Sequence, residues 1–327
     1  MSGGSAAAVP RHGSSARARV LDVLTEYAVL VLLVAIFVWL TFASEAFLSA
    51  QNILNILNQN APLAIVACAG TLVVIGGGFD LSTGAVVGVA AVVAAWIAVN
   101  IDPLLGILAA PVVGIALGLA NGLVIVGLRI HSFLATLASS LVYSGTSLFI
   151  TGGFLISVTA FPDFTVLGRG RIEGVNLAVL VFVAFAAAMW IILDLTPLGR
   201  YIYAMGGNEE AATLSGVRVD RVRIATFVLS GLAGGIAGAI IVSRIASGQP
   251  QTGEGIALQA IAAIILGGTS IYGGSGAVWR SIAGVYLLAL IGNGFNILNV
   301  NPFIKDLATG LIIIAAVGLS AARGRRR

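Results

Sequence analysis

The stretch that decides the fold lies at residues 104–128 and reads LLGILAAPVVGIALGLANGLVIVGL, without a charged side chain. A helix that crosses a lipid bilayer needs about 20 predominantly apolar residues. The whole chain shares this character, because 59% of its 327 residues are hydrophobic, 9% are charged and Lys305 is the only lysine. So little polar surface cannot cover so much apolar surface in water. The sequence therefore predicts a polytopic α-helical membrane protein.

Similar apolar runs recur along the chain, and we expect about ten spans in all. Their expected bounds are 22–43, 61–78, 83–99, 104–128, 132–151, 176–195, 222–246, 256–272, 277–298 and 303–321. Lipid offers no hydrogen-bond partner to exposed backbone groups, so these spans must be helices. The predicted fold is a single all-α transmembrane bundle over residues 21–322, with polar, basic tails at 1–20 and 323–327. Counts of eight or twelve spans remain open.

The placement of the basic residues predicts the orientation. With the N-terminus in the cytoplasm, most of the 17 basic residues fall on the cytoplasmic side, as the positive-inside rule requires. Both termini are then cytoplasmic. The arginines are scattered between apolar runs and form no basic face with interleaved aromatic residues, so membrane lipid is an expected partner and nucleic acid is not.

The motifs of common catalysts are missing from the sequence. No G-x-x-x-x-G-K-[ST] phosphate loop surrounds Lys305, and neither H-E-x-x-H nor G-x-S-x-G occurs. No metal site, cofactor or catalytic residue is expected, and the chain is not predicted to be an enzyme. Ion-driven carriers usually bury ionisable groups in mid-span, whereas Asp80 and Asp194 fall near span ends. The energy for any transport should therefore come from another source.

Two glycine-rich breaks interrupt apolar runs. Residues 76–86 read GGGFDLSTGAV and residues 267–278 read GGTSIYGGSGAV, a weak internal repeat that ends in Gly-Ala-Val each time. Unwound backbone at membrane depth survives only inside protein or beside a watery cavity, and paired breaks in transporters point to the transport path. Two ordinary interhelical turns are the alternative. The small-residue stripe from Gly106 to Gly122 favours close helix packing inside one subunit.

The predicted cytoplasmic segment 200–220 contains a short helix. Asn208 can cap its N-terminus, Glu209 and Glu210 occupy the first turn, where the helix dipole favours negative charge, and Gly216 can end it. Such a helix is either a docking element for a partner or a surface connection between two spans.

Polar and aromatic side chains inside or beside the spans are the candidates for a substrate path. They are Asp80, Ser82, Asn121, Phe133, Thr136, Gln259 and Asn293. Each has a structural alternative: Asp80 can cap a helix, Thr136 can do so with Ser132, the two asparagines can bond a neighbouring helix, Gln259 can pair helices, and Phe133, like Tyr272, can pack in the membrane.

Several motifs in order resemble the permease subunits of ribose/xylose-type bacterial sugar ABC transporters. They include GGFDLSTG at 77–84, SFLATL at 132–137, YAMGGNEEAA at 203–212, LSGLAGGIAG at 229–238 and AIAAIILGGTS at 260–270. The resemblance implies a multi-pass subunit of the bacterial cytoplasmic membrane that imports a monosaccharide or polyol. It also implies three partners: a cytoplasmic ABC ATPase, an extracytoplasmic substrate-binding protein and a second permease copy. The residues that it assigns to ATPase coupling are Gly207, Asn208, Glu209, Glu210, Ala211, Ala212, Ser215 and Gly216.

The resemblance has departures that bear on the solute. The family usually has an aromatic residue, a glutamate and a second acidic residue just before Ala260, where this chain has Ile256, Ala257, Leu258 and Gln259. Arg280-Ser281 replaces a usual Gly-Thr pair. The solute therefore stays open, and a branched-chain amino acid or nucleoside permease, or a self-sufficient secondary transporter, are the alternatives.

Overall fold

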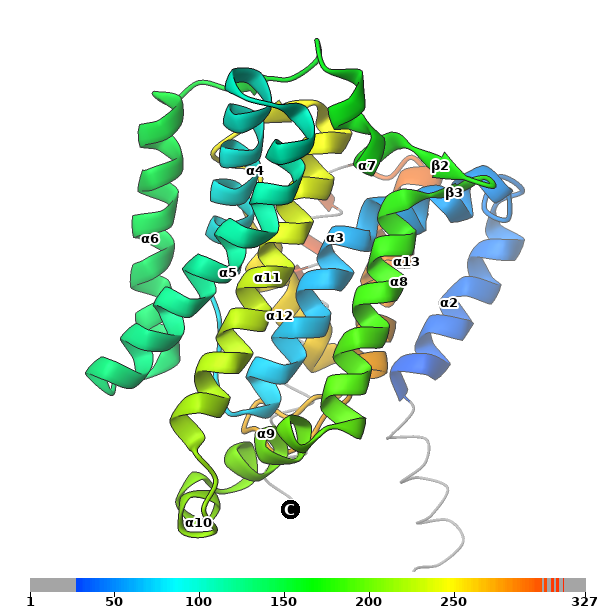
Figure 1. Ribbon diagram of the computed structural model, residues 1–327. Helices are drawn as coiled ribbons and strands as arrows, with labels where there is room; N and C mark the ends of the chain where they lie inside the picture. Colours follow the sequence, from blue (N-terminus) through cyan, green and yellow to red (C-terminus); the bar gives the residue numbers. More distant parts are fainter. Residues whose placement is uncertain (1–27, 302, 305–306, 309, 312–313, 315–327) are drawn as a thin grey trace, which may run out of the picture.

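A computed structural model describes residues 28–301, 303, 304, 307, 308, 310, 311 and 314 (Figure 1). Both predicted polar tails, Lys305 and most of the expected last span at 303–321 lie outside the described residues. The apolar helices are α2 (Ala28–Ala43), α3 (Ala50–Ile75), α4 (Thr83–Asn100), α5 (Pro103–Leu128), α6 (Ser132–Thr151), α8 (Leu177–Trp190), α11 (Val219–Ile245), α12 (Ile256–Leu266) and α13 (Val278–Ile297). They confirm the predicted all-α membrane bundle.

Within the described residues, seven helices are long and apolar enough to cross a membrane. α2 and α12 are shorter apolar helices. The expected count of ten spans is therefore not confirmed, although each of the first nine expected spans overlaps one of these helices.

Two expected span boundaries are wrong. α3 begins at Ala50, well before residue 61, because the Ser49 side chain accepts a hydrogen bond from the Asn52 amide and caps the helix there. The polar stretch that follows is helical, and Pro62 lies inside the helix. α12 ends at Leu266 instead of residue 272, because the chain turns at Gly268, whose φ is +89°.

The two ends of the bundle differ (Figure 1). At one end, the α7 end, lie η1 (Pro162–Thr165), α7 (Val166–Arg169) and two short antiparallel pairs, which are β1 (Ile156–Ser157) with β4 (Ser247–Gly248) and β2 (Arg171–Ile172) with β3 (Val175–Asn176). At the other, the α10 end, a π-helical turn η2 (Ile191–Leu195) leads into α9 (Pro197–Gly207) and α10 (Glu209–Leu214). The sequence predicted α10 and missed α9.

Close packing of α5 on α11 forms one side of the bundle. Gly114 and Gly231 approach so closely that a Cβ on either would overlap the carbonyl oxygen of the other. Gly118 packs in the same way on the backbone of Phe227. Small residues allow this approach where the hydrophobic effect gives helices little reason to associate. The small-residue stripe thus packs inside one subunit, as predicted.

Two helices begin inside the bundle rather than at its ends. The hydroxyl of Thr83, the first residue of α4, lies 3.4 Å from that of Ser230. Ser230 lies about 17 Å along the axis of α11 from its start, at about 1.5 Å per residue. The backbone of Ala257, near the start of α12, packs against Gly84. The N-termini of α4 and α12 therefore meet within the bundle.

Non-helical backbone leads to both of these N-termini. Residues 78–82 run from the end of α3 to α4, and residues 249–255 run from β4 to α12 along the side of α4. The second segment approaches α4 at two glycines: the Pro250 carbonyl meets Gly88 and the Gly253 carbonyl meets Gly84. A side chain at either glycine would hold this segment away from α4.

Candidate functional site

The non-helical segment at 78–82 obtains its hydrogen bonds from α6. The Ser132 hydroxyl accepts from the Phe79 amide and the Thr136 hydroxyl accepts from the Leu81 amide, both at 3.0 Å. Alternate amides of an extended chain point the same way, and residues four apart on a helix share a face. The hydroxyls of α6 thus supply the partners that lipid cannot offer.

A buried polar network starts from Asp80 in the same segment. Its Oδ1 accepts from the Ser82 amide at 2.9 Å and from the Ser82 hydroxyl at 2.6 Å, and its Oδ2 accepts from the Ser230 hydroxyl at 2.7 Å. The Asn121 side chain donates to the Ser82 hydroxyl at 2.7 Å and accepts from the Tyr143 hydroxyl at 2.9 Å. The Asp80 carboxylate has three donors, and the Asn121 side chain bonds both Ser82 and Tyr143. Every member of the network therefore has a partner, as buried polar groups require.

The network unites residues that the sequence proposed separately. Asp80, Ser82 and Asn121 are members, and Thr136 joins through the backbone of the same segment. Tyr143 and Ser230 were missed. Tyr143 follows Thr136 by seven positions and therefore shares its helix face, a signal that the sequence carried, whereas nothing in the sequence pairs Ser230 with Asp80.

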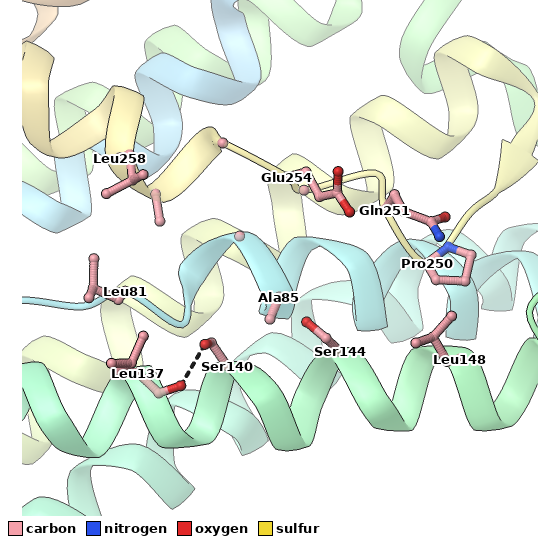
Figure 2. A pocket seen from close by; sticks show the side chains of 14 residues that line it. Leu81, Ala85, Leu137, Ser140, Ser144, Leu148, Pro250, Gln251, Glu254 and Leu258 are labelled. Atoms are coloured by element: carbon pink, nitrogen blue, oxygen red, sulfur yellow. Dashed lines mark hydrogen bonds between the residues drawn. The ribbon is translucent and has the colours of Figure 1, made fainter. Parts of the chain in front are cut away.

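A pocket of about 330 Å³ lies beside this network, between α6, the start of α4 and the segment before α12 (Figure 2). Ligand pockets in proteins begin at about this size. Its lining consists of Leu81, Gly84, Ala85, Leu137, Ser140, Ser144, Leu148, Pro250, Gln251, Gly253, Glu254, Gly255, Ala257 and Leu258. Glu254 is the single ionisable residue of this lining, and it lies across the pocket from Ser140 and Ser144 of α6 (Figure 2). The sequence singled out none of these three.

Three predicted path residues lie outside the network. Phe133 is exposed on α6, and Gln259 is exposed near the start of α12, next to the pocket residue Leu258. Asn293 of α13 exchanges two side-chain hydrogen bonds with Asn52 of α3, at 2.9 and 3.2 Å. Its geometry matches the helix-pairing alternative, and its contact with a solute stays a prediction, as it does for the other six.

The short helix predicted in the segment 200–220 is α10. The Asn208 side chain accepts from the Ala211 amide at 2.9 Å, and Gly216 has a φ of +85°, so both ends form as the sequence predicted. Glu209 pairs with Arg223 of α11 at 2.6 Å. Leu214, at the tip, is 83% exposed. The helix projects from the bundle (Figure 1), and Leu214 is an uncovered apolar side chain on it.

The two glycine breaks meet at the α10 end. The Gly274 amide donates to the Ile75 carbonyl at 2.8 Å, which joins the second break to the last residue of α3. Gly206 of α9 lies between them, where a Cβ would overlap the Ile75 carbonyl and crowd the Gly274 amide. The Tyr203 hydroxyl donates to the Gly276 carbonyl at 2.9 Å, and burial, followed by the charge of Asp194, raises its pKa. The segment that leads into α10 is thus packed onto both breaks.

Comparison with known proteins identifies relatives along nearly the whole chain. Residues 52–317 match the family model described as branched-chain amino acid transport system / permease component. The chain is 39% identical to the ribose import permease protein RbsC of Bacillus subtilis over 84% of this chain and 86% of that protein. It is 34% identical to RbsC of Haemophilus influenzae over 89% and 90% of the two chains. It is 40% identical to the L-arabinose transport system permease protein AraH of Escherichia coli over 60% of each.

No solved structure matches the chain significantly. Among the described residues, no group of three or more His, Cys, Asp or Glu side chains could hold a metal ion. The family match covers most of the chain, and the ribose import permeases share more than a third of their aligned residues with it. The protein is therefore a multi-pass membrane permease subunit and not an enzyme, and it belongs to the family of ABC transport permease components that includes the ribose import permeases.

Proposed function

We propose that this permease forms the membrane path of an ATP-driven importer for a monosaccharide or a related polyol. The observation that carries the solute class is the similarity to ribose and L-arabinose permeases. The pocket agrees with a neutral polyhydroxylated solute, because Ser140, Ser144, Gln251 and Glu254 offer hydrogen-bond partners on an otherwise largely apolar wall. A branched-chain amino acid is the second candidate, since the family description names that solute.

The path is completed by a second permease copy that packs along α6. In Figure 1, α6 stands at one edge of the bundle. Much of its surface is uncovered: Leu134, Leu141 and Phe149 are exposed. The pocket lies between α6 and the rest of the bundle, so a second copy at this edge would enclose it. Lipid covers the remaining apolar surface.

α10 is the element that engages the ATPase. It projects beyond the bundle, its ends are capped, and its Leu214 is uncovered. A force on α10 passes through Gly207 to Gly206, which is packed between the two glycine breaks. The first break includes residues 78–82, which place Leu81 in the wall of the pocket and Asp80 in the polar network beside it. Nucleotide binding at the ATPase would thereby change the pocket without any phosphate site in this chain.

The α10 end faces the cytoplasm in this proposal. Arg200, Arg218, Arg221 and Arg223 all lie at or near that end, as the positive-inside rule requires. An extracytoplasmic binding protein would deliver solute at the α7 end. Both termini are cytoplasmic in the same arrangement.

Purification of the tagged chain in mild detergent and reconstitution test the proposal. An ATPase is expected to co-purify, and vesicles that hold both with the binding protein should concentrate a pentose in the presence of ATP. Vesicles that hold the permease alone should concentrate nothing. Accumulation by the permease alone would overturn ATP coupling, and accumulation of branched-chain amino acids in place of pentoses would overturn the solute class.

A further inference from the structure

A second cavity, of about 340 Å³, opens on the surface at the α10 end. Its lining consists of Ile192, Leu198, Arg221, Ile224, Ala225, Val228 and Leu229. These residues come from the π-helical turn η2, the first turn of α9 and the first half of α11. We refer to this set as the α9–α11 groove.

The groove runs from the charged start of α11 into the apolar part of that helix. Arg221 is in the first turn of α11, and the apolar residues of the groove continue along the same helix to Leu229. A bilayer has the same profile, since charged headgroups lie at its surface and hydrocarbon lies below. An arginine with an apolar wall beneath it therefore fits one phospholipid molecule along the helix.

The walls of the groove are almost wholly apolar, and the charge of Arg221 at its rim favours an anion there. Arg221 is exposed and forms no ion pair among the described residues, whereas its neighbour Arg223 is neutralised by Glu209. Two carboxylates, Asp194 and Asp220, lie close in sequence to lining residues but are not part of the lining. α9 begins at Pro197 without a side-chain cap, and an uncapped helix N-terminus favours phosphate.

We propose that the α9–α11 groove binds one anionic phospholipid, with an acyl chain along Ile224, Val228 and Leu229 and the phosphate at Arg221. Basic pockets between helices at the cytoplasmic surface bind such headgroups. The groove borders α9, which carries α10, so the lipid would pack against the base of the segment that engages the partner. The proposal takes the orientation of the chain from the proposed function but does not depend on the solute or on ATP coupling.

Native mass spectrometry of the full-length chain in mild detergent tests the site with two probes, phosphatidylglycerol and phosphatidylcholine. The wild type should retain phosphatidylglycerol about fivefold more strongly than phosphatidylcholine, since a basic residue near the surface contributes about 1 kcal/mol to binding of an anionic lipid. Arg221→Gln should abolish this preference. Arg171→Gln, an exposed arginine at the α7 end, makes the same charge change and should preserve it.

A second variant tests the apolar part of the groove. Ala225→Phe fills the cavity and should remove the bound lipid whatever its headgroup, while the elution profile and the thermal unfolding of the lipid-free protein stay as in the wild type. Equal retention of the two lipids by the wild type would overturn the proposal. So would an Arg221→Gln protein that behaves like Arg171→Gln, or an Ala225→Phe protein that keeps its phosphatidylglycerol.

Discussion

The Asp80 carboxylate accepts a hydrogen bond of 2.7 Å from the Ser230 hydroxyl, across 150 positions of sequence. This bond fixes the non-helical segment after α3 to the middle of α11. The same carboxylate accepts from the amide and the hydroxyl of Ser82. Asp80 therefore holds the start of α4 in place, whatever further contact it makes with a solute.

We predict that Asp80→Ala destabilises the protein by about 3 kcal/mol. Three buried donors lose their acceptor, and hydrogen bonds to charged groups contribute about 1.5–3 kcal/mol each, partly recovered by relaxation. Unfolding of the purified protein in detergent measures the change. Asp163→Ala removes an exposed carboxylate from η1 and should change stability by less than about 0.5 kcal/mol. Equal stability of the two variants would contradict the role of Asp80.

Cysteine labelling can show whether the pocket beside α6 holds water. Cys68, the only natural cysteine, is fully buried, so the wild type should not react with a water-soluble maleimide. Ser144 lines the pocket, whereas Ser147 lies one turn further along α6 and is fully buried. Ser144→Cys should therefore label readily and Ser147→Cys should not. Equal labelling at the two positions would show that the pocket is not a separate aqueous space.

Glu254 should affect solute passage more than folding. Its carboxylate is the single charge in the lining of the pocket. The loss of one charge-assisted hydrogen bond, about 1.5 kcal/mol, corresponds to roughly a tenfold change in affinity for the solute. We predict that Glu254→Gln lowers uptake efficiency about tenfold in the reconstituted importer and leaves thermal stability unchanged. Glu45→Gln, at an exposed position after α2, is the matched control. Unchanged uptake by Glu254→Gln would remove the pocket from the path.

The sequence was most informative where local rules decide the structure. Apolar run length predicted α4, α5, α6 and α8 closely, and Asn208 with Gly216 predicted both ends of α10. α3 was predicted too short because its polar first turns lack the hydropathy of a span, although Ser49 caps them. α9 was missed because an 11-residue amphipathic helix between Pro197 and Gly207 carries no span signal.

The site could be predicted only in part, for a physical reason. Polar residues in apolar runs identified Asp80, Ser82 and Asn121, since burial obliges them to find partners. The choice of partner depends on which helices pack together, and no local pattern places Ser230 opposite Asp80. The pocket could not be predicted either, because its walls come from three segments that are distant in the sequence and lie together only through the packing of α4 and α12.

The segment 249–255 approaches α4 so closely that no side chain should be tolerated at Gly84. A Cβ there would overlap the Gly253 carbonyl, which belongs to backbone and cannot move aside cheaply. We predict that Gly84→Ala lowers the unfolding temperature and the yield of folded protein, since overpacking costs about 1–3 kcal/mol. Gly127→Ala, in α5, meets nothing within 4 Å and should be neutral or stabilising, because alanine favours a helix over glycine. A neutral Gly84→Ala would show that the segment is free to leave α4.

The exposed tip of α10 provides the most direct test of coupling. Leu214 is 83% exposed, and its helix α10 projects from the bundle (Figure 1), so a change there should not disturb the packing of the spans. A charge at the centre of an apolar contact is costly when it has no partner. We therefore predict that Leu214→Glu abolishes co-purification of the ATPase and ATP-driven uptake, while thermal unfolding stays unchanged. Leu155→Glu, at an exposed leucine before β1 at the α7 end, introduces the same charge and should leave the ATPase bound. If Leu214→Glu retains the ATPase and Leu155→Glu loses it, the partner docks at the α7 end and the proposed orientation is reversed.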